Sequence, residues 1–261
     1  MSAAYTAGLF DVAGKRALVT GATSGIGRMI ARGLAQAGVE VWVVARGAGD
    51  VEATVAELGG NAQGVAADIA TEEGIARVAE ALGDGPLHIL VNNAGTDRPT
   101  PLDADGREDF DAVLGLNLTA PFLLTRKLLP QLESGATPGD PARVINIASI
   151  AAINPGHLEN FAYASSKSGV AMMSRHLGRH LAKRNISCNA IAPGLFPSRM
   201  TERFLGMGEG DAVPKGFVTP LGARAGEMDD IAGAVIYLSS RAGAWVTGVL
   251  LPVSGGIYTV T

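Results

Sequence analysis

The alternation of strand-like and helical segments constrains the fold of this chain most strongly. Short apolar runs alternate with longer amphipathic stretches along most of its 261 residues. The short runs are continuously apolar, which is typical of strands buried on both faces of a parallel sheet. This alternation implies right-handed βαβ crossovers and predicts a doubly wound, Rossmann-type α/β domain, with a seven-stranded parallel sheet flanked by helices. The expected strands are residues 16–20, 39–45, 62–66, 87–91, 143–147, 186–191 and 248–252, and the expected helices include 25–37, 71–82, 107–133, 163–184 and 228–239.

The chain shows no internal division. Neither a linker nor a repeat interrupts it, which predicts one domain over residues 1–261. The stretch 194–224 is the longest irregular segment, and its length is more typical of a substrate lid than of a plain connection. We expect residues 150–161 and 198–218 to select the substrate. Apolar residues in the second segment suit an apolar or acyl-bearing ligand, although core or oligomer packing explains them equally well: Met200, Phe204, Leu205, Met207 and Phe217.

Composition argues against several classes of partner. The net charge is −4 and no basic run occurs, so a nucleic-acid partner is not expected. No apolar stretch reaches the roughly 18 residues that a membrane span needs. Residues 1–13 lack the basic start and apolar core of an export signal, which predicts a cytoplasmic protein. Cys188 is the only cysteine and lies in an apolar run, where a buried packing role is the favoured interpretation.

One pair of histidines has the spacing of zinc ligands. His176 and His180 lie four residues apart in an expected helix, so they would share one helix face. Arg175 and Arg179 flank them and no carboxylate follows, which favours a solvated helix face. We therefore expect no metal site.

A glycine-rich turn joins the first expected strand to the first expected helix. Residues 20–27 read Thr-Gly-Ala-Thr-Ser-Gly-Ile-Gly. Glycines permit positive φ angles and a close approach of the backbone to a ligand. The helix N-terminus that follows offers free N–H groups and partial positive charge to a pyrophosphate. A strand, turn and helix in this order favour a dinucleotide site, and a tight turn without a ligand is the alternative.

The end of the second strand indicates which dinucleotide would bind. Sites that prefer NAD place an acid there for the ribose 2′-hydroxyl, whereas an arginine accommodates the 2′-phosphate of NADP. This chain has Ala45 in the acid's place, followed by Arg46. The pattern favours NADP(H), unless Arg46 is a solvated surface residue. Arg28 either adds positive charge to the site or faces solvent.

Tyr163 and Lys167 form a pair that can carry proton chemistry. Four residues apart on a helix, they would lie one above the other. An ammonium beside a phenol favours the phenolate, which predicts that the pKa of Tyr163 falls from about 10 toward the working pH. Such a phenol can donate or accept a proton near neutral pH. The spacing also occurs by chance on exposed helices, so its meaning depends on the motifs that precede it.

Taken together and in this order, the motifs resemble those of the short-chain dehydrogenase/reductase family over nearly the whole chain. Within the family, the chain is most similar to NADPH-dependent 3-oxoacyl (β-ketoacyl) reductases, including the type found in rhamnolipid pathways. Residues 141–147 and 196–201 carry that finer similarity. The motifs that match the family are the turn at 20–27, Asp68-Ile69, Asn92-Asn93-Ala94-Gly95, Asn117, Ser149, Tyr163 with Lys167, and Pro193-Gly194.

The resemblance implies a catalytic role for four of these residues. Tyr163 would donate the proton during reduction, and Lys167 would lower its pKa and hold the nicotinamide ribose. Ser149 would donate a hydrogen bond to the substrate carbonyl, and Asn117 would support a water chain to Lys167. Ser149 as a plain loop hydroxyl and Asn117 as a helix-surface amide are the alternatives. The implied NADP(H) contacts are Gly21, Thr23, Ser24, Gly25, Ile26, Gly27, Arg46, Asp68, Ile69, Asn92, Ala94, Gly95, Tyr163, Lys167, Pro193, Gly194, Phe196 and Ser198.

Three functions remain open at this point. The first is an NADPH-dependent reductase of a small-molecule ketone, such as a 3-oxoacyl thioester or another β-keto compound. The second is an alcohol, steroid or sugar dehydrogenase of the same fold that works oxidatively. The third is a dinucleotide-binding regulator without turnover, which the complete set of catalytic residue types argues against. The resemblance also implies a homotetramer or a homodimer.

Overall fold

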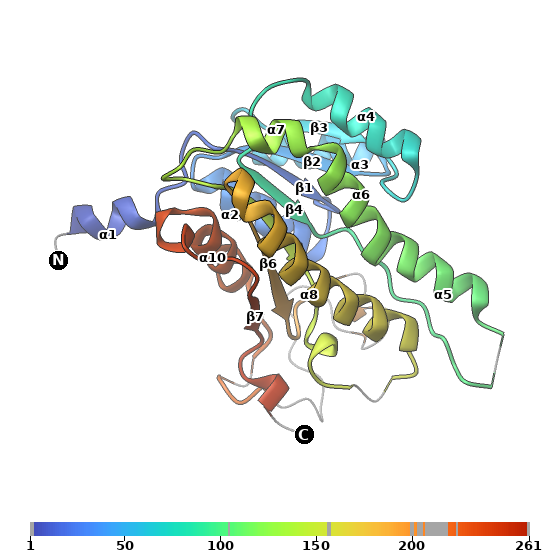
Figure 1. Cartoon of the computed structure of the whole chain (residues 1–261). Helices are drawn as coiled ribbons and strands as arrows, with labels where there is room; N and C mark the ends of the chain where they lie inside the picture. Colours follow the sequence, from blue (N-terminus) through green and yellow to red (C-terminus); the bar gives the residue numbers. More distant parts are fainter. Residues whose placement is uncertain are drawn as a thin grey trace.

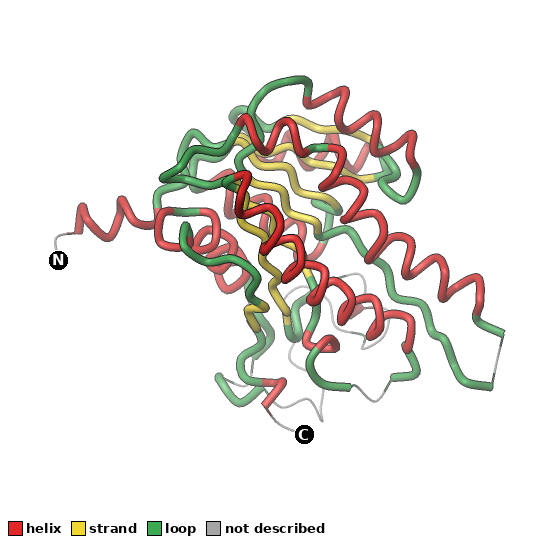
Figure 2. Tube along the Cα trace, in the orientation of Figure 1, coloured by secondary structure: helices red, strands yellow, loops and turns green. Residues whose placement is uncertain are grey.

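The computed structural model describes residues 3–103, 105–155, 158–198, 201–202, 206, 219–222 and 224–259. Its strands form a single parallel sheet of seven strands in the order β3-β2-β1-β4-β5-β6-β7 (Figures 1 and 2). The predicted fold class is therefore confirmed, and each expected strand is found with small shifts at its ends. The strands are β1 Arg16–Thr20, β2 Glu40–Ala45, β3 Gln63–Ala66, β4 Ile89–Asn92, β5 Ala142–Ile147, β6 Ile186–Pro193 and β7 Leu250–Val253.

Helices cover both faces of the sheet, as the two views of the chain show (Figures 1 and 2). Helices α2, α3 and α10 pack on one face, and α4, α6 and α8 pack on the other. Helix α1 projects from the body beside the N-terminus. The helix bounds are α1 Ala3–Phe10, α2 Gly25–Gln36, α3 Ala48–Leu58, α4 Glu72–Leu82, α5 Arg107–Leu114, α6 Ala120–Lys127, α7 Leu129–Ser134, α8 Phe161–Leu181 and α10 Met228–Ser239.

Two hydrophobic cores lie on opposite sides of the sheet, because successive strand residues point to opposite faces. In β1, Val19 packs with Ile30 of α2 and Val235 of α10. Leu18, one residue earlier, packs with Val78 of α4 and Leu124 of α6. Both faces of each central strand are therefore buried, which explains why the strand sequences are continuously apolar. Within the described residues, no helix is both long and apolar enough to cross a membrane.

The predicted helix over residues 107–133 is only partly correct. The segment is helical from α5 through α6, but Gly115–Thr119 form a π-helical turn between them. A separate short helix, α7, then follows Leu128. Pro130 lies in the first turn of α7, where its missing N–H leaves no hydrogen bond unmade. The apolar periodicity that suggested one helix carries no signal for the extra residue of a π turn.

The stability of the protein is expected to depend on pH because of a histidine at the edge of the sheet opposite the carboxyl ends of the strands. His88 accepts a hydrogen bond at Nδ1 from the backbone N–H of Arg16, at 2.9 Å. Burial, and then the nearby Lys15, lower the pKa of His88 below its usual 6.5. The unfolded chain consequently binds more protons than the folded chain just below pH 6.5, so stability is lost as the pH falls through this window.

We therefore expect the free energy of unfolding to decrease between about pH 7 and pH 5. His88→Gln keeps a hydrogen-bond acceptor that does not titrate, so its decrease should be smaller. Denaturant unfolding of both proteins across this range measures the difference. Identical pH dependence in the two proteins would show that His88 does not contribute.

Candidate functional site

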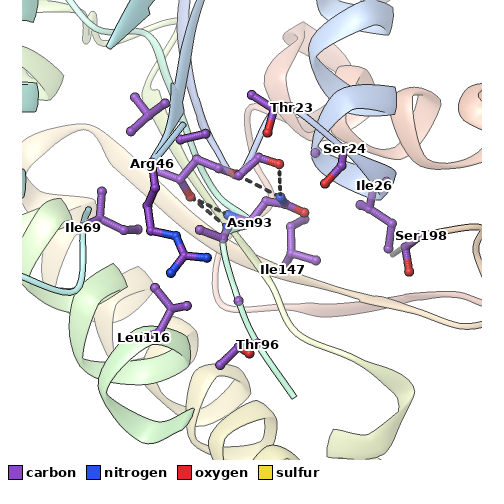
Figure 3. Close-up of a pocket in the computed structure, with 18 of the residues that line it drawn as sticks. Thr23, Ser24, Ile26, Arg46, Ile69, Asn93, Thr96, Leu116, Ile147 and Ser198 are labelled. Carbon is purple, nitrogen blue, oxygen red and sulfur yellow. Dashed lines mark hydrogen bonds between the residues drawn. The ribbon is translucent and has the colours of Figure 1, made fainter. Parts of the chain in front are cut away.

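A cavity of about 840 Å³ opens at the carboxyl ends of the strands (Figure 3). Ligands of open α/β sheets bind at this edge, where the strand order reverses between β1 and β4. Residues from all parts of the chain line it, from the turn after β1 to the segment after β6. The predicted site residues along its wall are Gly21, Thr23, Ser24, Gly25, Ile26, Gly27, Arg46, Asp68, Ile69, Ala94, Gly95, Ser149, Tyr163, Lys167, Pro193, Gly194, Phe196 and Ser198.

The glycines of the turn after β1 are required by close backbone contacts. Gly21 and Gly25 have positive φ angles of 65° and 51°. A Cβ on Gly27 would lie 2.2 Å from the carbonyl oxygen of Gly21, so only glycine fits there. Helix α2 begins at Gly25, with its N-terminus directed at the cavity. The turn can thus accept a phosphate group close to its backbone N–H groups.

Asn93 holds this turn in place, a role that the sequence motif alone did not reveal. Its side-chain Nδ2 donates to the carbonyl oxygens of Thr20 and Gly21, at 2.8 and 3.3 Å (Figure 3). The Thr20 hydroxyl in turn accepts from the backbone N–H groups of Asn93 and Ala94. The loop after β4 and the turn after β1 therefore form one rigid wall of the cavity.

The last residues of β2 and the residue after them present an arginine and no carboxylate to the cavity, although Asp50 of α3 also lines it. Arg46 is exposed, and its side chain extends toward Ile69 and Leu116 (Figure 3). Arg28, in contrast, pairs with Glu57 of α3 at 2.5 Å and does not line the cavity. Asp68, which follows the neighbouring strand β3, also lines the cavity and accepts a hydrogen bond from the backbone N–H of Ala70.

Tyr163, Lys167 and Ser149 line the same cavity. Helix α8 carries the first two one turn apart, and the Lys167 ammonium lies 5.6 Å from the centre of the Tyr163 ring. Lys167 is 5% exposed and donates to the carbonyl oxygen of Ile147, the last residue of β5, at 2.8 Å. Ser149 is the second residue after β5; its hydroxyl accepts from the backbone N–H of Ala151 at 3.1 Å and favours the ionised form of the Tyr163 phenol, which lowers the pKa of Tyr163.

The pKa shift predicted for Tyr163 is in the wrong direction. Burial raises the pKa of Tyr163 to about 12, and the hydrogen bond from Ser149 offsets only part of this effect. Burial also lowers the pKa of Lys167 to about 8. The sequence placed an ammonium beside the phenol, but it gave no measure of how far the site is removed from water, and that desolvation dominates. The phenol is therefore protonated at neutral pH.

Asn117 lies at the π turn, where the helix turns its side chain inward. The residue is 2% exposed, and its Oδ1 accepts from the backbone N–H of Thr96 at 2.8 Å. Its Nδ2 donates to the carbonyl oxygen of Thr96 and to the hydroxyl of Ser166 on α8. Asn117 is thus a buried link between the loop after β4 and α8. The alternative interpretation as a helix-surface amide is wrong.

Asn92 does not line the cavity, in contrast to the prediction that it would contact the cofactor. Its side chain is buried within the sheet layer and donates to Oδ1 of Asn146 on β5 and to the hydroxyl of Thr125 on α6. Asn146 continues this chain of hydrogen bonds to Ser174 on α8. Strand alternation explains the difference, because Asn92 is the last residue of β4 and still points away from the edge of the sheet.

Two predicted cofactor contacts that follow β6 lie close to glycines from other parts of the chain. Phe196 is buried, and a Cβ on Gly226 would lie 2.3 Å from its ring, so Gly226 makes room for the large side chain. Ser198 approaches Gly25, where an added Cβ would lie 2.8 Å from the serine Cβ. Most of the expected lid at 194–224 lies outside the described residues, including Met200, Phe204, Leu205, Met207 and Phe217.

Comparison with known proteins places the chain in a family. The sequence profile of short chain dehydrogenases matches residues 15–206. The chain belongs to the short-chain dehydrogenase family. A 3-oxoacyl-(acyl-carrier-protein) reductase of rhamnolipid biosynthesis from Pseudomonas aeruginosa is 40% identical over 253 residues, which cover 95% of this chain and 98% of the relative. The expected resemblance is therefore confirmed.

Other short-chain dehydrogenases similar to this chain have different substrates in their names. A gluconate 5-dehydrogenase from Gluconobacter oxydans is 33% identical over 261 residues, covering 95% of this chain and 96% of the relative. Among solved structures, a Pseudomonas aeruginosa RhlG/NADP active-site complex superposes with a TM-score of 0.88 and 39% identity, covering 96% of this chain and 99% of the other. This protein is accordingly an oxidoreductase of the family.

Proposed function

We propose that the protein is an NADPH-dependent reductase that converts the ketone of a 3-oxoacyl thioester or related β-keto compound to a secondary alcohol. The observation that carries this proposal is that Tyr163, Ser149 and Lys167 line the same cavity as the glycine-rich turn after β1. The relative from rhamnolipid biosynthesis supports the substrate class.

The cavity walls fit a dinucleotide phosphate. Gly21, Gly25 and Gly27 provide the space and the backbone conformation that a pyrophosphate requires beside the α2 N-terminus. At the end of β2, Ala45 provides no carboxylate to repel a 2′-phosphate, and Arg46 provides a guanidinium to bind one. Similar structures that contain NADP support the same assignment. Bound NADPH supplies hydride chemistry at its nicotinamide.

The residues of the chain would position the carbonyl and deliver the proton. The Ser149 hydroxyl and the Tyr163 phenol would both donate hydrogen bonds to the carbonyl oxygen, where negative charge develops during reduction. Tyr163 would then transfer its phenolic proton to that oxygen. Lys167, whose pKa of about 8 leaves it largely protonated at pH 7, would stabilise the phenolate that remains.

The oxidative dehydrogenase is the second candidate, and the gluconate 5-dehydrogenase relative favours it. Oxidation of an alcohol requires a phenolate as the base, whereas reduction requires a phenol. Burial raises the pKa of Tyr163 to about 12, which supports reduction at neutral pH. A screen that follows NADPH absorbance with β-ketoacyl thioesters, β-keto esters, steroids, keto sugars and quinones tests the proposal. Tight NADPH binding without turnover of any compound would instead support a regulator.

The choice of NADP(H) over NAD(H) should depend on Arg46. We expect Arg46→Ala to weaken NADPH binding by roughly 10-fold or more, since it removes a charge-assisted hydrogen bond to phosphate. NADH binding should change little, because NADH has no 2′-phosphate. Fluorescence titration with both cofactors measures the two affinities, and Arg28→Ala is the matched control, because Arg28 pairs with Glu57. Equal losses for NADPH and NADH in Arg46→Ala would contradict the assignment.

A further inference from the structure

A buried carboxylate lies beside the candidate catalytic residues and has no role in the proposed mechanism. Asp97 is 6% exposed and belongs to the loop that follows β4. Its Oδ2 accepts a hydrogen bond from Nδ2 of Asn160 at 2.9 Å. Asn160 is the N-cap residue of α8, but its side chain makes no capping bond to the helix. The side chain of Asn160 therefore binds Asp97 and does not cap the helix.

The same loop holds the first turn of α8 at a second point. The Thr100 hydroxyl accepts from the backbone N–H of Ala162 at 3.3 Å, and the Thr100 N–H donates to the carbonyl oxygen of Glu159. Thr96, at the start of the loop, is bound on both sides by Asn117. Tyr163 is the third residue of α8, so its position depends on how this turn lies against the loop.

The negative charge of Asp97 acts on both titrating groups of α8. It raises the pKa of Tyr163 and opposes the lowering of the pKa of Lys167. A carboxylate near a helix N-terminus is also stabilised by the helix dipole, which offsets the cost of burying it. The other charged side chains in the adjoining described segments are exposed or paired: Glu159 is exposed, and Arg98 pairs with Asp109 at 2.7 Å.

We infer that Asp97 is a positioning residue of this site, which holds the first turn of α8 against the loop after β4 and places a buried negative charge near Tyr163 and Lys167. This inference rests on the proposed reductase function. It assigns two separable tasks to one side chain: a hydrogen bond to Asn160 and a negative charge near Tyr163 and Lys167.

Asp97→Asn separates the two tasks, because an amide oxygen still accepts from Asn160 but carries no charge. Without the charge, Tyr163 and Lys167 lose their protons more easily. The fall in kcat/KM for reduction at high pH should then begin roughly half to one pH unit lower than in the wild type. Asp97→Glu keeps the charge and should keep the wild-type profile. The probe reaction is NADPH with acetoacetyl-coenzyme A, or the first ketone of the screen that turns over.

Two controls separate a charge effect from a change in packing. Thr100→Val removes the hydroxyl contact of this loop to the N–H of Ala162, keeps the backbone bond to Glu159, and should lower kcat without moving the pH profile. A pH profile of Asp97→Asn that coincides with the wild type would overturn the inference, and a profile of Thr100→Val that moves equally would do the same. If Asp97→Asn does not fold, Asp97→Ser still removes the charge, and a pH profile that coincides with those of Asp97→Glu and the wild type would overturn the inference. Tyr163→Phe distinguishes the two proposals, since full activity in that variant would refute the proposed chemistry and not Asp97 alone.

Discussion

Replacing Tyr163 by phenylalanine is expected to lower kcat for NADPH-dependent ketone reduction by roughly 10²- to 10⁴-fold. The change removes one hydroxyl group and keeps the ring that packs beside Lys167. The proton donor to the carbonyl oxygen is lost, whereas the glycine-rich turn after β1 and Arg46 are untouched. NADPH affinity should therefore stay within a few-fold of the wild type. Steady-state kinetics and fluorescence titration measure these two quantities separately.

Tyr237→Phe is the matched control for this variant. Tyr237 is a partly buried residue of α10 that packs on the core at the opposite face of the sheet and does not line the cavity. Its loss of a hydroxyl should leave kcat unchanged. Wild-type turnover by Tyr163→Phe would show that another group donates the proton.

Lys167→Met is the second change with a large expected effect, and it should separate activity from stability. Lys167 is buried with its ammonium bonded to one backbone carbonyl, and burial lowers its pKa to about 8. Methionine fills a similar volume without a charge, so the folded state no longer bears the cost of a buried ammonium, but buried Asp97 loses a nearby positive charge. Because these two effects oppose each other, we expect the melting temperature to stay close to that of the wild type. kcat should fall by roughly 10²-fold or more, because the phenolate formed by Tyr163 loses its stabilising charge.

Thermal unfolding and steady-state kinetics on the same preparation measure this separation. Lys183→Met, which changes an exposed lysine just beyond α8, should alter neither quantity. A clear drop in melting temperature for Lys167→Met would indicate that the bond to Ile147 is needed mainly for folding.

The sequence predicted the sheet well because both faces of its strands are buried. In a chain of this size, a continuous apolar run such as Val41 to Val44 is compatible with few structures other than a buried strand. The helix at 107–133 was predicted as one element, since neither a π turn nor a bend before Pro130 disturbs apolar periodicity enough to be seen. Local pattern thus identified the elements, but not the irregularity that turns Asn117 inward.

The candidate site was predicted from motifs. The predictions that were wrong depend on how side chains are buried, which the motifs do not report. Asn92 belongs to a motif that borders the cavity, but strand alternation directs its side chain away from the cavity, where it binds Asn146 of β5. The pKa of Tyr163 depends on desolvation, which no spacing of residues reports. Asp97 binds Asn160, and Phe196 packs against Gly226. Each contact joins segments that are far apart in the sequence, so it is evident only in the folded structure.

The π turn at Gly115–Thr119 makes the length of this helix as important as its composition. The i→i+5 turn holds one residue more than an α-helical turn, and it takes up that residue with little change in the phase of α6 relative to α5. Asn117 lies within the turn and binds Thr96, whereas Thr125 of α6 binds Asn92. Deletion of one residue from the turn is therefore expected to keep α6 in place and to lose the inward position of Asn117, so its cost falls on the site and not on the fold.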